Sequence, residues 1–269
     1  MKKIFLFAFS ALLLASCSEG DYGYYESTEP YYPYEHSQPP AKTLTGFLIF
    51  DYAFDAFTAV PELLTYAIKL DECLSAQPAD SAALFRRYFY DWDITSSAGT
   101  WKISNREQIL IIDTGGKPLS EPSASWNVYC NLDGLYITYD SCKITYSDDG
   151  GLRIRISQGR FADMFRGSAD FTVEKRKNEL NTLRPYLFDL RGKGSLQAIL
   201  NTDFHIEYST DGFLRQTEIF WDGTMDISCT SSNPTPDDVR AFLSANNRVT
   251  ITYKGITDEW TYTPHGRYM

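Results

Sequence analysis

The sequence predicts a mainly β protein with minor α content, built from antiparallel meander sheets that follow N-terminal helices. Three observations favour this fold class. From residue 91 onward apolar and polar side chains alternate, turn pairs containing Gly recur at short intervals, and the segment 44–90 shows helical spacing instead. Most gaps between strands are too short for the helices that a parallel sheet needs. A sandwich-like or barrel-like arrangement fits this pattern, and whether it has one β layer or two stays open.

The segment 44–90 is expected to form helices that pack on the sheet. Pro61 fits a first helical position, and a second helix is expected from Asp80, a good N-cap, through Tyr88. Each helix carries an apolar stripe that must cover a partner surface. The stripe of the first helix consists of residues at three- and four-residue spacing, namely Val60, Leu63, Leu64, Ala67, Ile68 and Leu74.

The segment 91–269 is expected to form the antiparallel β domain. Residues 101–103, 126–130, 144–146 and 154–156 alternate in the way that half-buried strands do. Short Gly-containing runs between and beyond these ranges tolerate the positive φ of tight turns. These pairs are Gly115-Gly116, Asp133-Gly134, Asp149-Gly150-Gly151, Asp211-Gly212 and Asp222-Gly223.

Two interruptions break the strand series. The segment 178–200 contains Pro185, Gly192 and Gly194, so we expect irregular chain with one strand at 186–190 and consider a sub-boundary within 157–200. The run Thr235-Pro236-Asp237-Asp238 is typical of a helix start, which predicts one helix, ending by Asn246-Asn247, before the last strands.

The first seventeen residues have the order of an export signal. Lys2 and Lys3 precede an apolar run from Ile4 to Leu14, which is too short to span a bilayer stably, and Leu14-Ala15-Ser16-Cys17 follows. This arrangement resembles a bacterial lipoprotein signal with its lipobox. The resemblance implies that residues 1–16 are removed and that Cys17 receives diacylglycerol and further acylation, such as palmitate.

Residues 17–43 are expected to be the lipidated Cys and a tether. Ser18 to Lys42 contains six Tyr and four Pro and no Val, Leu, Ile or Met, so it cannot form a core and suits a semi-rigid spacer; a Tyr-rich recognition strip is the alternative. Glu19 and Asp21 are similar to the early acidic residues of surface-exported lipoproteins of Bacteroidota. Together with Ser18, they imply an outer-membrane and surface-exposed location.

Charge limits the classes of partner. Removing Lys2 and Lys3 with the signal lowers the formal net charge from −10 to −12. A chain this acidic is not expected to bind nucleic acid, and anionic lipid headgroups should repel it. The acyl anchor is therefore the expected membrane contact.

Chemical motifs are few. The sequence contains no phosphate loop, no zinc-protease motif and no nucleophile elbow, and we expect no cofactor and no metal. The three His are His36, His205 and His265, and they are widely separated. His205 alternates with its neighbours in a way that places it beside Glu207 on an outer strand face, where a solvated pair is expected and a general base is the alternative.

Four thiols remain once Cys17 is lipidated. Cys130 and Cys229 share the parity of core residues, which favours buried free thiols among Cys73, Cys130, Cys142 and Cys229. If a disulfide forms in an oxidising envelope, Cys130 and Cys142 are the expected pair, since they lie on neighbouring strands across the Asp133-Gly134 turn.

The remaining candidates are acidic pairs and aromatic residues. Asp91 with Asp93, Asp148 with Asp149 and Asp237 with Asp238 could supply the two carboxylates of a glycosidase, although turns and helix caps explain all three pairs. Trp221 precedes Asp222-Gly223, so it is a candidate ligand-binding aromatic at a loop edge.

These observations predict an envelope-anchored surface lipoprotein that is not an enzyme and that binds or displays a glycan or protein ligand. A structural or accessory envelope component is the alternative, and a β-rich hydrolase is a further one.

Overall fold

The computed structural model describes residues 43–121, 123–132, 134–138, 140–146, 151–161, 163–177, 186–215, 221–231, 236–244 and 248–261. All of them lie within the compact unit His36–Met269. The predictions for the signal at 1–16, Cys17, the tether to residue 42, His36 and His265 fall outside the described residues.

Two helices begin the described chain. Helix α2 spans Leu44–Ser75 and helix α3 spans Pro78–Tyr88. The second helix is confirmed as α3, although Gln77 rather than Asp80 is its N-cap and Asp80 lies in its first turn. The predicted start at Pro61 is wrong, because α2 continues through that residue. Pro61 is buried in the middle of α2, so tertiary packing outweighs the loss of one backbone hydrogen bond. Among the described residues, no helix is long and apolar enough to cross a membrane.

Within the described residues, fourteen strands form one antiparallel sheet. The sequence left open whether there are one or two β layers, and the described strands all belong to a single sheet. They follow one another in the sheet in chain order, except that β6 lies off the main path and pairs with β4 and β7. The strands are β1 (Asp93–Ser97), β2 (Thr100–Ser104), β3 (Ile109–Asp113), β4 (Ser125–Leu132), β5 (Leu135–Ile137), β6 (Cys142–Tyr146), β7 (Leu152–Phe161), β8 (Phe165–Lys177), β9 (Tyr186–Ala198), β10 (His205–Arg215), β11 (Trp221–Thr230), β12 (Asp237–Ser244), β13 (Arg248–Tyr253) and β14 (Ile256–Thr261).

The helix predicted from residue 235 is wrong, because residues 237–244 form strand β12. Val239, Ala241 and Leu243 are buried while the residues between them are not, which is the period of a strand. β12 pairs with β11 on one side and β13 on the other. Ladder hydrogen bonds on both sides outweigh the local helix-start pattern.

Two predicted turns are also wrong. Asp211-Gly212 lies in a register shift within β10, and Asp222-Gly223 lies inside β11. By contrast, Gly115, Gly116 and Gly134 adopt positive φ between strands, as expected. The described residues within 157–200 contribute to β7, β8 and β9, which are neighbours in the sheet, and the strand expected at 186–190 extends to Ala198. Residues 178–185, where irregular chain is expected, lie outside the described residues.

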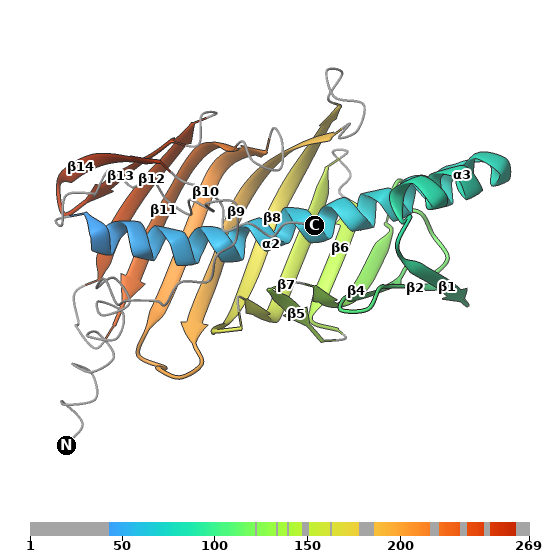
Figure 1. Cartoon of the computed structure of the whole chain (residues 1–269), viewed down its shortest axis with the longest axis horizontal. Coiled ribbons are helices and arrows are strands. Elements are labelled where there is room, and N and C mark those ends of the chain that lie inside the picture. Colours follow the sequence, from blue (N-terminus) through green and yellow to red (C-terminus); the bar gives the residue numbers. More distant parts are fainter. Residues whose placement is uncertain are drawn as a thin grey trace, which may run out of the picture. The chain divides into compact units, whose positions relative to one another are not determined.

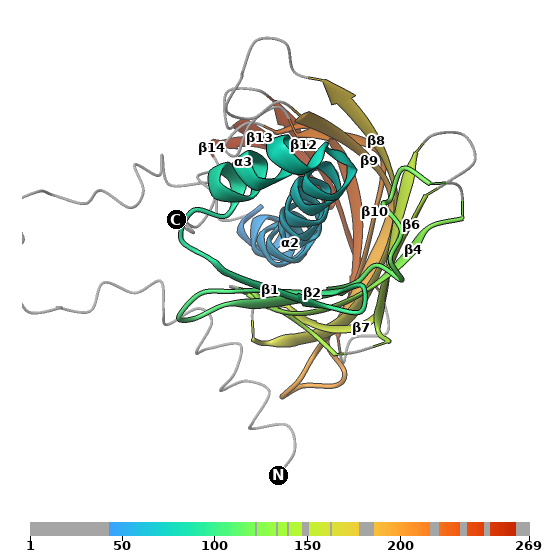
Figure 2. The ribbon, with the colours of Figure 1, turned by 90° about the vertical axis from the view of Figure 1, so that its right-hand side faces the viewer.

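Helix α2 lies on one face of the sheet and crosses its strands (Figure 1), and the sheet curves around it (Figure 2). α2 contacts strands β7 and β9–β13. Aromatic contacts include Phe54 with Phe213, Phe57 with Phe171, and Phe47 stacked 4.1 Å from Trp260. Thr43 donates a hydrogen bond to Asp258 at 2.6 Å, which joins the start of α2 to β14. The inner face of the sheet therefore belongs to the core, and polar residues are left on the outer face.

Candidate binding groove on the outer face of the sheet

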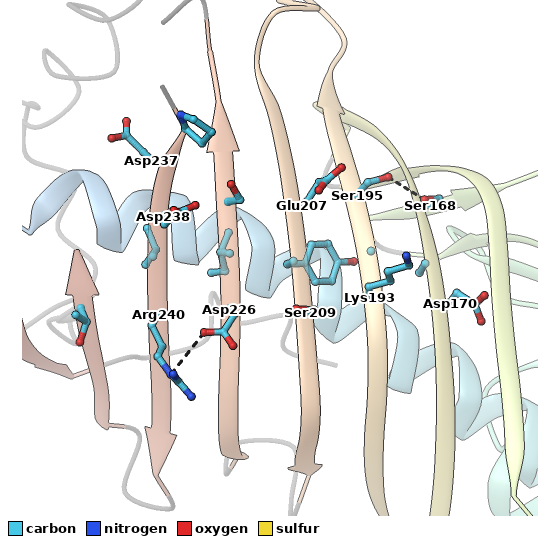
Figure 3. A pocket seen from close by; sticks show the side chains of 18 of the residues that line it. Ser168, Asp170, Lys193, Ser195, Glu207, Ser209, Asp226, Asp237, Asp238 and Arg240 are labelled. Carbon is cyan, nitrogen blue, oxygen red and sulfur yellow. Dashed lines mark hydrogen bonds and ion pairs between the residues drawn. The ribbon is translucent and has the colours of Figure 1, made fainter. Parts of the chain in front are cut away.

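A cavity of about 1260 Å³ forms a groove on the face of the sheet that lies away from α2 (Figure 3). Its side chains form two rows across the strands, because residues paired in register point to the same face. The first row contains Arg155, Asp170, Lys193, Ser209, Asp226 and Arg240. The second row contains Ser168, Ser195, Glu207, Ser228 and Asp238. We call this cavity the outer groove.

The floor of the outer groove is backbone. Between the two rows the groove is lined by Ile156, Ala169, Gly194, Tyr208, Ile227 and Val239. The side chains of all but Gly194 are buried in the core, so these residues present their backbone to the groove. From β7 to β12 the groove crosses five strand spacings, or roughly 24 Å. Such a length suits an extended polymer.

Hydrogen bonds and ion pairs order the walls. The hydroxyls of Ser168 and Ser195 are 2.8 Å apart, and Arg240 pairs with Asp226 at 3.5 Å (Figure 3). At the β13 end, Lys254 pairs with Asp237 at 2.9 Å. The hydroxyl of Tyr253 donates to the same carboxylate at 3.1 Å, and the hydrogen bonds to Tyr253 and Asp237 raise the pKa of Lys254.

The strongest ion pairs lie at the β7–β8 end. Nε and Nη2 of Arg153 each donate to Asp170 at 2.8 Å, and Arg155 donates to Oδ2 of the same carboxylate at 3.1 and 3.2 Å. The hydrogen bonds from Arg153 are the main cause of the lowered pKa of Asp170, with further contributions from Arg155. This carboxylate is therefore charged at neutral pH and holds both guanidinium groups in place.

A second hollow adjoins the groove at the same end. It is lined by Arg153, Asp170, Thr172, Arg191 and Asp211, among others. Arg191 pairs with Asp189 at 3.1 Å. Cations thus gather over β7–β9. Among the described residues at the opposite end, four carboxylates, Glu207, Asp226, Asp237 and Asp238, outnumber two cations, Arg240 and Lys254, which pair with Asp226 and Asp237. The two ends of the outer groove differ in charge.

The structure brings only some of the sequence candidates to the groove. Asp237 and Asp238 line it, and Asp91 and Asp93 do not. His205 and Glu207 share an outer face with 3.4 Å between Nε2 and Oε1, which confirms the expected pair, and Glu207 also lines the groove. Asp148 and Asp149 lie outside the described residues.

Trp221 is the first residue of β11 and pairs in register with Arg215, and its side chain lies outside the described part of the chain. It does not appear among the described residues that line the groove. Its role in ligand binding stays a prediction.

Cys73, Cys130, Cys142 and Cys229 are buried, free thiols in the structure. Burial raises the pKa of Cys130 to about 12 and raises that of Cys142 well above its ordinary value. The Sγ atom of Cys130 lies 3.8 Å from the Leu135 carbonyl oxygen, to which it donates. A disulfide between Cys130 and Cys142 in an oxidising envelope stays a prediction.

Sequence reasoning missed most of the outer groove. Alternating polar residues, such as Arg153 and Arg155 or Lys193 and Ser195, were the available signal for an outer strand face. The rows themselves depend on strand register, which brings Arg155 and Arg240 into one row although they are 85 positions apart. Within the described residues, no group of three or more His, Cys, Asp or Glu could hold a metal ion.

Comparison with protein families matches residues 1–18 to the prokaryotic membrane lipoprotein lipid attachment site. The chain is thus an envelope-anchored lipoprotein, as its N-terminal residues predict. The searches of curated proteins and of solved structures each found no match.

Proposed function

We propose that this lipoprotein is a non-catalytic binding module that holds an extended glycan in the outer groove. The observation that carries the proposal is a groove of five strand spacings with hydroxyl and charged groups in two registered rows. Ser, Thr and carboxylate side chains supply the donors and acceptors that sugar hydroxyls need, and the exposed backbone floor allows a flat chain to approach. The side chains that line the described groove in its two rows are polar or charged, so polar contacts are proposed to dominate.

Binding without turnover is part of this proposal. Hydrolysis would need two carboxylates across the groove, and the pair with the best placement is Glu207 and Asp238, two strand spacings or roughly 10 Å apart. The side chain of Glu207 is 72% exposed, so it lacks the apolar enclosure in which glycosidases hold their acid. Asp170, Asp226 and Asp237 are each engaged by a cation.

We also propose that the acyl anchor, with palmitate among its chains, lies in the outer membrane and displays the domain on the cell surface. Ser18, Glu19 and Asp21 support this location. A display site facing the medium suits a protein whose groove is open along its length.

The test is a glycan array probed with the full-length protein in detergent micelles, followed by a hydrolysis assay on every bound glycan. Ser195→Tyr should abolish the best signal because it fills the middle of the groove. Thr250→Tyr is the matched control, since Thr250 lies on the outer face of β13 and does not line the groove. Tyr suits exposed strand positions, so both variants should fold.

Three results would change the proposal. Product release from any bound glycan would favour the hydrolase. A blank array together with a co-purifying envelope protein would favour a structural or accessory component. Loss of binding in Trp221→Ala but not in Ser195→Tyr would move the site from the groove to the start of β11.

A further inference from the structure

We propose that the ligand of the outer groove is an anionic polysaccharide whose carboxylate or sulfate groups bind the cations over β7–β9. This inference rests on the proposed function and adds the class of glycan. It concerns a specific set of four side chains, Arg153, Arg155, Arg191 and Lys193, which we call the cationic grid.

Strand register arranges the cationic grid. Arg153 on β7 is opposite Thr172 on β8, which is opposite Arg191 on β9. Two residues further along β7, at the next position on the same face, Arg155 is opposite Asp170 on β8, which is opposite Lys193 on β9. The cations on β7 and β9 thus flank β8 at two strand spacings, or roughly 10 Å.

Carboxylates engage three of the four cations of the grid and leave the fourth unpaired within the described residues. Asp170 is shared between Arg153 and Arg155, and Arg191 pairs with Asp189. Asp211 and Glu174 also lie beside the grid, because Asp211 lines the same hollow and Glu174 is opposite Asp189 in register. Within the described part of the chain Lys193 is exposed and has no ion-pair partner, so it is the cation most available to an anionic ligand.

The cations are held in place and remain open to solvent. The side chains of Arg153, Arg155 and Arg191 are 46%, 58% and 58% exposed. Arg153 and Arg155 each use two N–H groups on Asp170, and a guanidinium has five. Arg153, Arg191 and Lys193 line a hollow of about 670 Å³, and Arg155 lines the adjoining outer groove, so an anion there would meet preorganised groups.

Lining chemistry favours a glycan over an acidic peptide. Acidic peptides also bind Arg clusters, so the choice between the two ligands depends on the other groups of the lining. The cationic grid lies on inner strands of the sheet rather than at an edge, and its hollow also includes the hydroxyls of Thr172 and Ser209. Hydroxyls beside cations match sugar hydroxyls beside a carboxylate or sulfate.

The opposite end of the groove limits how the ligand's charge is spaced. Glu207, Asp226, Asp237 and Asp238 would repel a second anionic group there. The structure therefore favours a polysaccharide in which anionic sugars are separated by neutral ones.

The test uses hyaluronan, in which carboxylate sugars alternate with neutral ones, and chondroitin sulfate, which adds sulfate. Carboxyl-reduced hyaluronan is the neutral control, and poly-L-glutamate is the acidic peptide control. Full-length protein in micelles should bind hyaluronan or chondroitin sulfate, and at least about tenfold more weakly when NaCl is raised from 0.05 to 0.5 M. Chondroitin sulfate carries an anionic group on both sugars of its repeat, so hyaluronan, with its wider charge spacing, should bind more strongly; stronger binding of chondroitin sulfate would show that sulfate is preferred and that the acidic end does not limit charge spacing.

The double variant Arg155→Gln/Lys193→Gln should weaken this binding at least about tenfold, because one charge-assisted hydrogen bond corresponds to roughly that factor. It leaves the two hydrogen bonds from Arg153 to Asp170 intact. Lys102→Gln/Lys143→Gln makes the same change in net charge at exposed positions outside the groove and should bind as the unchanged protein does.

Each other outcome decides against this inference. If carboxyl-reduced hyaluronan binds equally well and Ser195→Tyr abolishes the binding, the groove binds glycans without selecting anions. If poly-L-glutamate binds in preference, the ligand is an acidic peptide. If neither hyaluronan nor chondroitin sulfate binds, the inference fails, while the glycan array separately decides the proposed function.

Discussion

At the scale of single residues, Gly194 shows how the core sets the floor of the groove. A Cβ atom at this position would overlap the ring of Tyr208, which is its cross-strand partner. Gly194→Ala should therefore lower the free energy of unfolding by about 1–3 kcal/mol through overpacking. Chemical denaturation measures this change, and an unaltered midpoint would show that the ring of Tyr208 moves without cost.

Tyr208→Phe is the matched change on the other side of this contact. The hydroxyl of Tyr208 is buried and has no hydrogen-bond partner among the described residues, and burial raises its pKa. Removing a buried, unsatisfied hydroxyl should leave stability unchanged or raise it by about 1 kcal/mol. A loss above this amount in the same denaturation experiment would reveal a bound water or another partner.

The four buried thiols make a prediction about reactivity. Burial raises the pKa of Cys73 and Cys130 to about 12 and that of Cys229 to about 11, so the reactive thiolate is scarce at pH 8. Native protein should resist alkylation at that pH, and unfolded, non-reduced protein should gain four labels by mass spectrometry. Two labels would instead establish a disulfide, with Cys130 and Cys142 the expected pair.

At the scale of elements, α2 links strands that are far apart in the sheet. Leu63 lies in the middle of the helix and is fully buried. Leu63→Ala should cost about 2–5 kcal/mol, since a cavity forms where the helix meets the sheet. Leu200→Ala, at a side chain that is 91% exposed, should change stability by less than about 0.5 kcal/mol. Equal midpoints for the two variants in thermal unfolding would contradict this account of the core.

Elements with one dominant pattern could be predicted from the sequence, and elements with two competing patterns could not. The alternation at Ile154 and Ile156 predicts a strand, which the structure forms as β7. The helical pattern before Tyr88 has no competing strand pattern, and the structure forms α3 there. In β12, a Pro-Asp-Asp helix start competes with the alternation of Val239, Ala241 and Leu243, and pairing with two neighbouring strands decides the outcome. Local sequence does not contain this information, because the partners lie elsewhere in the chain.

The same reason explains why the candidate site was found only in part. Alternation predicts that Arg155, Lys193 and Arg240 lie on an outer face, but only register shows that they belong to one row. The sequence predicted Asp237 and Asp238 as a helix start, and their position in the groove follows from β12 being a strand. Trp221 was favoured because it precedes a Gly that, in the structure, lies inside β11 rather than in a turn.

At the scale of the whole molecule, attachment to the envelope depends on the first residues of the chain. The described helices offer no membrane span, and a formal net charge of −12 after signal removal disfavours contact with anionic headgroups. The acyl chains on Cys17 are then expected to supply the binding energy, since each buried methylene contributes about 0.8 kcal/mol. Loss of the Cys17 thiol should therefore detach an otherwise intact protein from the membrane.

Cys17→Ala tests this expectation directly. Metabolic labelling with an alkyne fatty acid should mark the unchanged protein and leave the variant unlabelled, with the chain either uncleaved or released into the soluble fraction. Cys229→Ala, which removes a core thiol instead, should keep the full label and controls for labelling of other cysteines. Unchanged label in Cys17→Ala would exclude Cys17 as the acylated residue. An unlabelled variant that stays in the membrane fraction after signal cleavage would instead reveal a second membrane contact, which the acidic charge of the chain argues against.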